Sequence, residues 1–239
     1  MMLWYKAWLE TRSRFLISLF GILIICSGWV LHEDAIASPS QPANWYYFVL
    51  HKSHDTLVML WVLAVSLLMM GGLLREGAVG ASDFTLALPV SRARLTRARI
   101  GVGFLQAMTL AVIPSVVIFL LACATGKANS VENAAFHLLL LAVGGSVFVA
   151  WALLVSTLIS GEYTAPAVCL GTVLVVAIAM GDKPLSAWSP LSLLGGEQYL
   201  NPNTMMLSGP VPWLRLAVTI MVAAALAWAA VKAVQMKEF

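Results

Sequence analysis

Two histidines and an aspartate in one polar stretch have a spacing that could bind a metal. His51 and Asp55 are four residues apart, His54 lies between them, and His32 belongs to the same stretch. Imidazole and carboxylate groups are common zinc ligands, but a structural site needs four ligands and the spacing fixes no fourth. We therefore predict a solvated helix entrance without a metal, and keep His51, His54 and Asp55 as the alternative ligand set. Asp55, followed by Thr56 and an apolar run, also suits a helix N-cap.

The sequence pattern lacks the groups that enzymatic catalysis requires. Gly144–Ser146 superficially resembles a serine-nucleophile motif, but no histidine in a second inner apolar segment is placed to activate the serine. There is no His-Glu-x-x-His motif and no pair of glutamates. His137 is the titratable group well inside an apolar run, and we interpret it as a satisfied or interface-facing imidazole rather than a proton relay. We predict that the chain is not an enzyme and itself binds no cofactor.

Nucleotide binding by this chain is also not expected. A phosphate-binding loop has the pattern G-x-x-x-x-G-K-[ST], whereas Gly126-Lys127 has Leu121 at the first glycine position and Ala128 after the lysine. The basic residues are not interleaved with stacking aromatic residues, which argues against a nucleic-acid partner.

The composition predicts a membrane protein. Of the 239 residues, 61% are hydrophobic and 10% are charged, and the mean hydropathy is +0.90. Soluble domains carry about 25% charged residues. Cys26, Cys123 and Cys169 each lie inside an apolar run, where a thiol behaves as a small hydrophobic group.

The apolar runs predict an all-α polytopic membrane protein with six transmembrane helices. Each run has about the length that a bilayer requires. The predicted spans are residues 15–31, 56–74, 101–125, 134–160, 164–180 and 213–234. Residues 32–55 and 181–212 are then external segments, and 75–100 is a cytosolic loop. The second external segment mixes leucines and Trp188 with prolines and glycines, which predicts short helices at the outer interface before the sixth span.

The amino-terminal residues allow more than one interpretation. Residues 2–14 place Leu3, Trp4, Ala7 and Trp8 on one helical face, which predicts a separate helix lying on the membrane surface. The alternative is that they simply extend the first span. Ala35–Ala37 also resembles a signal-peptidase site, so cleavage of a leader is a further alternative.

The distribution of cations predicts that both termini are cytoplasmic, because cytoplasmic loops carry an excess of Lys and Arg. The interior group is Lys6, Arg12, Arg14, Arg75, Arg92, Arg94, Arg97, Arg99, Lys232 and Lys237, and the exterior group is Lys52, Lys127, Lys183 and Arg215.

The cytosolic loop contains a feature that topology alone does not explain. The arginines of 92–99 are what anchoring would produce, and Ser91 stands where the N-cap of a helix beginning at Arg92 is expected. Phe84–Leu88 is instead a short apolar patch that Pro89 terminates. Such an element can insert into a groove on a soluble partner.

Asp83–Arg92, DFTLALPVSR, resembles the cytosolic segment of type-2 ATP-binding-cassette (ABC) permeases, which has the pattern L-[DE]-x-L-L-x-[LS]-P-[VI]-[ST]-R. Glu76 and Gly80 stand where the lead of that segment has a glutamate and a glycine. The departures from the pattern are Ala78, Ala81 and Ser82. The number of spans and the expected amino-terminal helix also resemble this family.

The resemblance implies a function. Residues 1–239 would be a single permease domain, an exporter subunit that pairs with a second copy or a paralogue in a bacterial plasma (inner) membrane. A separate cytosolic ABC ATPase would bind the ATP and magnesium. The coupling residues would be Glu76, Gly80, Asp83, Phe84, Leu86, Leu88, Pro89, Ser91 and Arg92. The alternatives are a membrane anchor or regulatory subunit that recruits a cytosolic protein, and a gradient-driven carrier.

Overall fold

The computed structural model describes residues 2–32, 45–69, 92–125, 130–159, 164–180, 189–199, 201 and 210–236. The regular elements within these residues are all helical, which confirms the predicted all-α class. They are α1 (Met2–Leu31), α3 (Trp45–Leu68), α6 (Arg92–Ala124), α7 (Val131–Leu139), the π-helical turn η1 (Leu140–Gly144), α8 (Ser146–Leu158), α9 (Thr164–Ala179), α11 (Pro190–Gly195), the 3-10 turn η2 (Glu197–Tyr199) and α12 (Trp213–Met236).

Four helical stretches within the described residues are long and apolar enough to cross a membrane. They are Leu3–Leu31, Arg97–Ala124, Val131–Leu158 and Trp213–Met236. α9, where the fifth span is predicted, has 16 residues and is shorter than the roughly 20 that a spanning helix needs. α3, where the second span is predicted, carries His51, Lys52, His54 and Asp55 in its first half. The structure therefore supports four of the six predicted spans by length and composition.

The predicted separate amino-terminal helix is wrong, because residues 2–14 continue into the first span as one helix. α1 runs through 30 residues. Its first half has neither proline nor glycine, and the Thr11 hydroxyl donates to the Ala7 carbonyl oxygen within the helix at 3.1 Å. With no residue to interrupt the helical hydrogen bonds, the amphipathic start and the apolar span form a single rod.

α3 also differs from the prediction, since it begins at Trp45 rather than after Asp55. The expected external loop of 32–55 is therefore helical from residue 45, and Asp55 lies inside the helix rather than at its N-cap. By contrast, α6 begins at Arg92 as predicted and continues to Ala124 with Pro114 inside it. Two short helical elements, α11 and η2, precede the last span, in the segment where the sequence predicts short helices.

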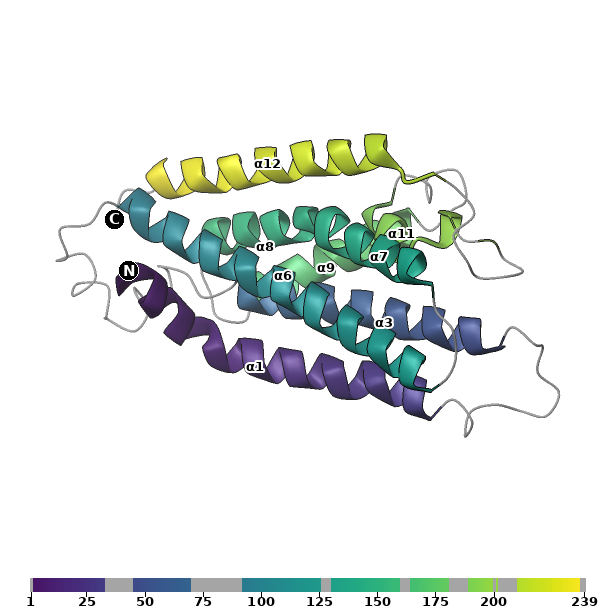
Figure 1. The fold of residues 1–239 in the computed structure, drawn as a ribbon. Helices are drawn as coiled ribbons and strands as arrows, with labels where there is room; N and C mark the ends of the chain where they lie inside the picture. Colours follow the sequence, from purple (N-terminus) through teal and green to yellow (C-terminus); the bar gives the residue numbers. More distant parts are fainter. Residues whose placement is uncertain are drawn as a thin grey trace.

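The long helices run along a common direction, with α1 and α12 at opposite margins of Figure 1 and α6 crossing between them. Both ends of the chain lie at one end of the bundle, beside the start of α6 (Figure 1). The starts of α3, α7 and α12 lie at the other end, together with α11.

Trp61 of α3 holds the middle of the bundle together. Its side chain is fully buried, and its indole Nε1 donates to the Ala107 carbonyl oxygen of α6 at 2.9 Å. Its ring lies directly over Gly145, which follows the π turn, so that a Cβ at Gly145 would overlap it. A small residue at this position is therefore what lets α3, α6 and the α7–α8 segment come together.

Candidate functional site

Most of the predicted coupling residues fall outside the part of the chain that the structure describes. This holds for Glu76, Gly80, Asp83, Phe84, Leu86, Leu88, Pro89 and Ser91. Arg92 is the first residue of α6. What the structure does describe is the junction of the helices that flank this segment, the end of α3 and the start of α6.

α1 contacts the end of α3 at this junction. The guanidinium of Arg14 donates through Nη1 to the Leu67 carbonyl oxygen, in the last turn of α3, at 3.4 Å. Met69 follows that turn and its side chain packs directly over Gly103 of α6. The last turn of α3 is therefore held by both α1 and α6.

α1 also contacts the first third of α6 through two polar pairs. Arg99 Nη2 lies 3.0 Å from Glu10 Oε2, with these side chains 14% and 29% exposed. About two turns further along α6, Gln106 Nε2 donates to Thr11 Oγ1 at 2.8 Å. Both flanks of the 70–91 segment are therefore fixed to the same helix, α1.

Cations gather at this end of the bundle, which we call the cationic end. The start of α1, the start of α6 and the end of α12 lie together there (Figure 1). The cations on these parts of the helices are Lys6, Arg12, Arg14, Arg94, Arg97, Arg99 and Lys232. Lys52 and Arg215 belong to the first halves of α3 and α12, which start at the opposite end. The same division appears in the sequence, where the first seven cations belong to the group predicted to be interior and Lys52 and Arg215 to the group predicted to be exterior.

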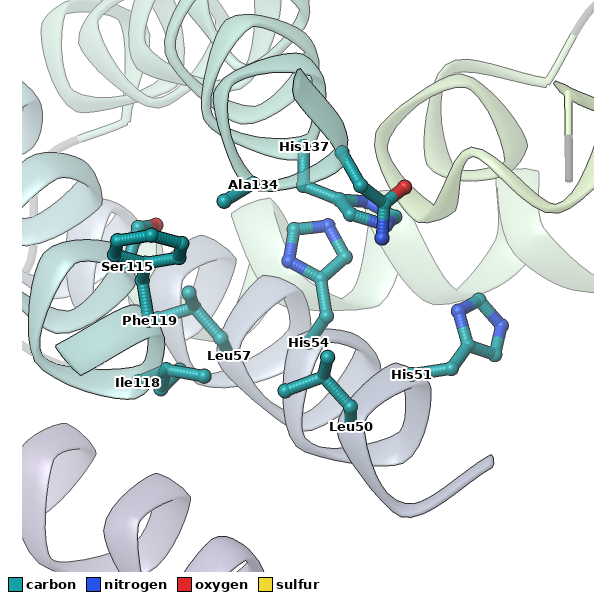
Figure 2. A pocket seen from close by; sticks show the side chains of 10 residues that line it. Leu50, His51, His54, Leu57, Ser115, Ile118, Phe119, Ala134 and His137 are labelled. Carbon is teal, nitrogen blue, oxygen red and sulfur yellow. The ribbon is translucent and has the colours of Figure 1, made fainter. Parts of the chain in front are cut away.

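At the opposite end of the bundle, three histidines from two helices come together; we call His51, His54 and His137 the histidine cluster. His51 and His54 lie on α3, and His137 lies on α7. The ring centroids of His54 and His137 are 4.1 Å apart, and those of His51 and His137 are 6.4 Å apart. Figure 2 shows the His54 and His137 rings facing each other, with His51 set to one side.

The cluster borders a small cavity of about 40 Å³. Its remaining wall comes from Leu50 and Leu57 of α3, from α7 and from the second half of α6 (Figure 2). The Ser115 hydroxyl donates to the Ala111 carbonyl oxygen at 2.7 Å. The cavity has room for water but not for a drug-sized molecule.

The hydrogen bond of His54 fixes its tautomer. His54 is 7% exposed, and its Nε2 lies 3.3 Å from the Leu194 carbonyl oxygen of α11. A carbonyl oxygen can only accept, so Nε2 carries the proton and Nδ1 of the neutral ring has the lone pair. Burial lowers the pKa of His54 to about 4. His54 lies outside the four candidate spans, in the polar first half of α3.

The partner ring of His137 is what sequence reasoning did not predict. The Nδ1 of His137 is buried and has no hydrogen-bond partner among the described residues. The imidazole packs against the His54 ring of α3. Asn133, one helical turn earlier, is buried on the same side of α7, and this i,i+4 pair of polar residues in an apolar helix was the available signal.

The alternative metal site is not formed among the described residues, where no group of three or more histidine, cysteine or carboxylate side chains could hold an ion. His54 already bonds Leu194, and the Asp55 carboxylate oxygen Oδ2 lies 3.7 Å from His51 Nε2 and 3.3 Å from Lys52 Nζ. His51, His54 and Asp55 therefore do not converge on one point.

A second cavity lies against α11. It has a volume of about 200 Å³ and an apolar lining. Pro190 and Leu191 of α11 line it together with Trp151 of α8 and Val173 of α9. The indole Nε1 of Trp151 donates to Thr172 Oγ1 at 2.8 Å, so the polar groups of this wall are bonded to each other. α11 thus lines an apolar cavity with its first residues and bonds His54 through Leu194 near its end.

No protein-family model matches the chain, and no curated protein matches it either. The assignment of a function therefore rests on the residues and on the geometry described above.

Proposed function

We propose that this chain is the membrane-spanning subunit of an ABC transporter that exports its substrate, using ATP hydrolysis on a separate ATPase. The observation that carries the proposal is the Asp83–Arg92 sequence, which connects α3 to α6. The four helices with the length and composition of spans support a membrane location for the chain. The cationic end would face the cytoplasm, because Lys and Arg accumulate on that side.

The contacts at the cationic end give this proposal a mechanical basis. α6 continues from Arg92 without a break, so a displacement of its first turn by an ATPase would be carried along the helix. Ser115, Ile118 and Phe119, on the second half of α6, line the cavity beside the histidine cluster. Closure of the ATPase dimer would therefore shift packing at both ends of the bundle between two discrete arrangements.

α1 would move with α6 rather than independently. The Glu10–Arg99 ion pair and the Gln106–Thr11 hydrogen bond join two consecutive residues of α1 to two positions about two turns apart on α6. Trp4 of α1 also packs directly over Gly101 of α6, where a Cβ would overlap the ring. The pair would then act as one body when the partner ATPase binds ATP.

The experiment that tests the proposal first looks for an ATPase with Walker motifs encoded next to this chain, and then co-expresses the two proteins. Phe84→Asp and Leu88→Asp each place a carboxylate in the predicted apolar docking patch, which costs several kcal/mol if the patch is buried in the complex. We expect both variants to lose co-purification with the ATPase and to lose stimulated ATP hydrolysis. Thr85→Asp is the matched control, because it adds the same charge to a residue that is not a predicted contact.

The outcomes separate this proposal from its alternatives. If both variants keep the complex and its ATP hydrolysis, the docking assignment is wrong. If the docking patch binds a cytosolic protein that has no Walker motifs, the chain is an anchor or regulatory subunit instead. Loss of binding with Thr85→Asp as well would show that added charge, rather than the patch, disrupts the segment.

A further inference from the structure

We propose that the histidine cluster is an acid-sensitive latch that holds α11 against α3 and α7 and releases it when the cluster takes up a proton. The inference does not depend on the proposed transport function, because it rests on contacts at the end of the bundle away from the ATPase-docking segment.

α11 is seated on two of the three histidines. The Leu194 carbonyl oxygen accepts the His54 Nε2–H at 3.3 Å, and the Leu194 side chain is fully buried. Gly196, which ends α11, has a φ of 69°. A Cβ there would lie 3.0 Å from Leu140 and 3.7 Å from the His137 ring. The end of α11 therefore fits closely against α7 and α3, at the place where the imidazoles meet.

The closed arrangement requires neutral imidazoles. Protonation of His54 would add an N–H at Nδ1, which needs an acceptor inside a buried site. The neighbouring ring does not supply one. Two imidazoles joined by an in-plane N–H···N bond of about 2.9 Å would have centroids roughly 5 Å apart. The His54 and His137 centroids are closer than this, at 4.1 Å, and their rings are tilted by 46°, so they touch through their faces.

The charged groups around the cluster do not offset a buried cation. On α3 these are Lys52 and Asp55, and the Asp55 carboxylate is already 3.3 Å from the Lys52 ammonium. On α7 the described carboxylate is Glu132, which is exposed. The described side chains that α6 and α11 contribute to the contact are neutral. On η2, the Tyr199 hydroxyl accepts from Arg215 Nη1 at 2.9 Å, which places a further cation near this end.

His51 is the third member of the cluster. Its Nε2 lies 3.7 Å from Asp55 Oδ2, and its ring centroid is 6.4 Å from that of His137. Burial is the main cause of the lowered pKa of His54, and the electrostatic effect of His51 lowers that pKa further.

The direction of the pH dependence follows from the burial of His54. Its pKa is about 4 in the closed arrangement, and about 6.5 in an open, solvated one. The closed arrangement is therefore fully stable above about pH 6.5 and is lost as the pH falls toward 4. For this one group the opening equilibrium should rise about tenfold per pH unit in that window, or about 100-fold between pH 7 and about pH 4.5.

Release of α11 would also open the second cavity. Pro190 and Leu191 form part of its wall, facing Trp151 and Val173. Acid would then connect the apolar cavity to the outer end of the bundle.

Hydrogen–deuterium exchange of the purified full-length chain tests the latch. Exchange of the 189–199 backbone is measured at about pH 7 and about pH 4.5, with each rate divided by its intrinsic rate. We expect the corrected exchange of this segment to accelerate by up to about 100-fold in acid, and the α12 segment 216–230 to change little. His54→Gln keeps an amide N–H for the Leu194 carbonyl but does not titrate, and His137→Phe keeps an aromatic ring. His54→Gln should retain protection at neutral pH and lose most of the acid response. His137→Phe leaves His54 to titrate, so it should retain both the protection at neutral pH and most of the acid response.

His32→Gln is the matched control, because His32 is exposed at the end of α1 and is not in the cluster. It should respond to acid as the unmodified chain does. The proposal is overturned if the unmodified chain shows no acceleration specific to 189–199, or if His54→Gln keeps the full response. Each variant is compared separately, so a variant that fails to fold leaves the other one and the unmodified chain to decide.

Discussion

The Glu10 carboxylate contacts two cations, Arg99 of α6 and Lys6 of its own helix. Only the first contact joins α1 to α6. Glu10 Oε2 lies 3.0 Å from Arg99 Nη2, and Glu10 Oε1 lies 3.9 Å from Lys6 Nζ within α1. The Arg99 side chain is 14% exposed, whereas that of Lys6 is 38% exposed. Solvent screens the second contact more strongly than the first, so the two should differ in free energy.

Neutralising Glu10 should therefore destabilise the chain modestly and through Arg99. We expect Glu10→Gln to lower the free energy of unfolding by about 1 kcal/mol, an amount that already allows for partial exposure. A double-mutant cycle with Arg99→Gln, measured by denaturant unfolding in detergent, should return a coupling energy of about 0.5–1 kcal/mol.

Lys6→Gln is the control for this measurement, with an expected loss of about 0.3 kcal/mol, as for an exposed i,i+4 pair. A coupling energy of zero between Glu10 and Arg99 would show that the ion pair does not join the helices.

At the scale of elements, the close approach of α3 to the α7–α8 segment depends on one missing side chain. Gly145 has an ordinary helical φ of −66°, so it is not required for its conformational freedom. It is required for space, because the Leu141 carbonyl oxygen and the Trp61 ring both lie in the volume that a Cβ would take. Gly171 in α9 is the opposite case, because a Cβ added there would have nothing within 4 Å.

Alanine substitutions at these two glycines should therefore have opposite effects. We expect Gly145→Ala to lower the free energy of unfolding by about 2 kcal/mol or more, because the Leu141 carbonyl and the Trp61 ring must both shift to make room for the added methyl group. Gly171→Ala should be neutral or stabilising by up to about 1 kcal/mol, since alanine favours the helix. Thermal unfolding of the purified variants measures both. Equal losses would show that glycine itself, rather than the space over Gly145, matters.

Helix positions were predictable where periodicity and hydropathy agree, and were less predictable where polar residues extend a helix. The start of α6 at Arg92 and the short helix α11 follow from sequence patterns that the structure confirms. The early start of α3 does not, because His51, Lys52, His54 and Asp55 resemble a loop until His54 is seen to bond α11. Tertiary contacts of this kind override local patterns.

The same limit applies to the histidine cluster. His54 and His137 are far apart in the sequence, and their ring contact depends on how α3 and α7 pack. Local spacing suggested three ligands on α3 alone, whereas the packing partner of His54 comes from α7. The docking segment around Phe84 stays a prediction, because it lies outside the described residues.

For the whole molecule, the cationic end and the histidine cluster lie at opposite ends of the helix bundle. Arg94 and Arg97 are exposed at the start of α6, and both ends of the chain lie beside them (Figure 1). The cluster lies at the far ends of α3 and α7. If the cationic end is cytoplasmic, the two ends must differ in their access to an external reagent.

Labelling with a membrane-impermeant maleimide tests this orientation. In a background with Cys26, Cys123 and Cys169 replaced by alanine, we expect Glu132→Cys to react in intact cells. Ser13→Cys should react only after the cells are permeabilised. Both native side chains are exposed, so burial does not limit either reaction. The reverse pattern would show that the cationic end is external.

The unbroken length of α1 sets how motion can pass through the molecule. Thirty residues at about 1.5 Å each make a rod about 45 Å long. The hydrocarbon core of a bilayer is about 30 Å thick, and helices tilt by about 0–40°. Enclosing the whole rod would need a tilt of roughly 48°, beyond that range. Part of α1, with Glu10 and Trp4, must then stand outside the hydrocarbon as a rigid lever arm. A sideways push on this arm would turn the intramembrane part of the helix rather than bend it.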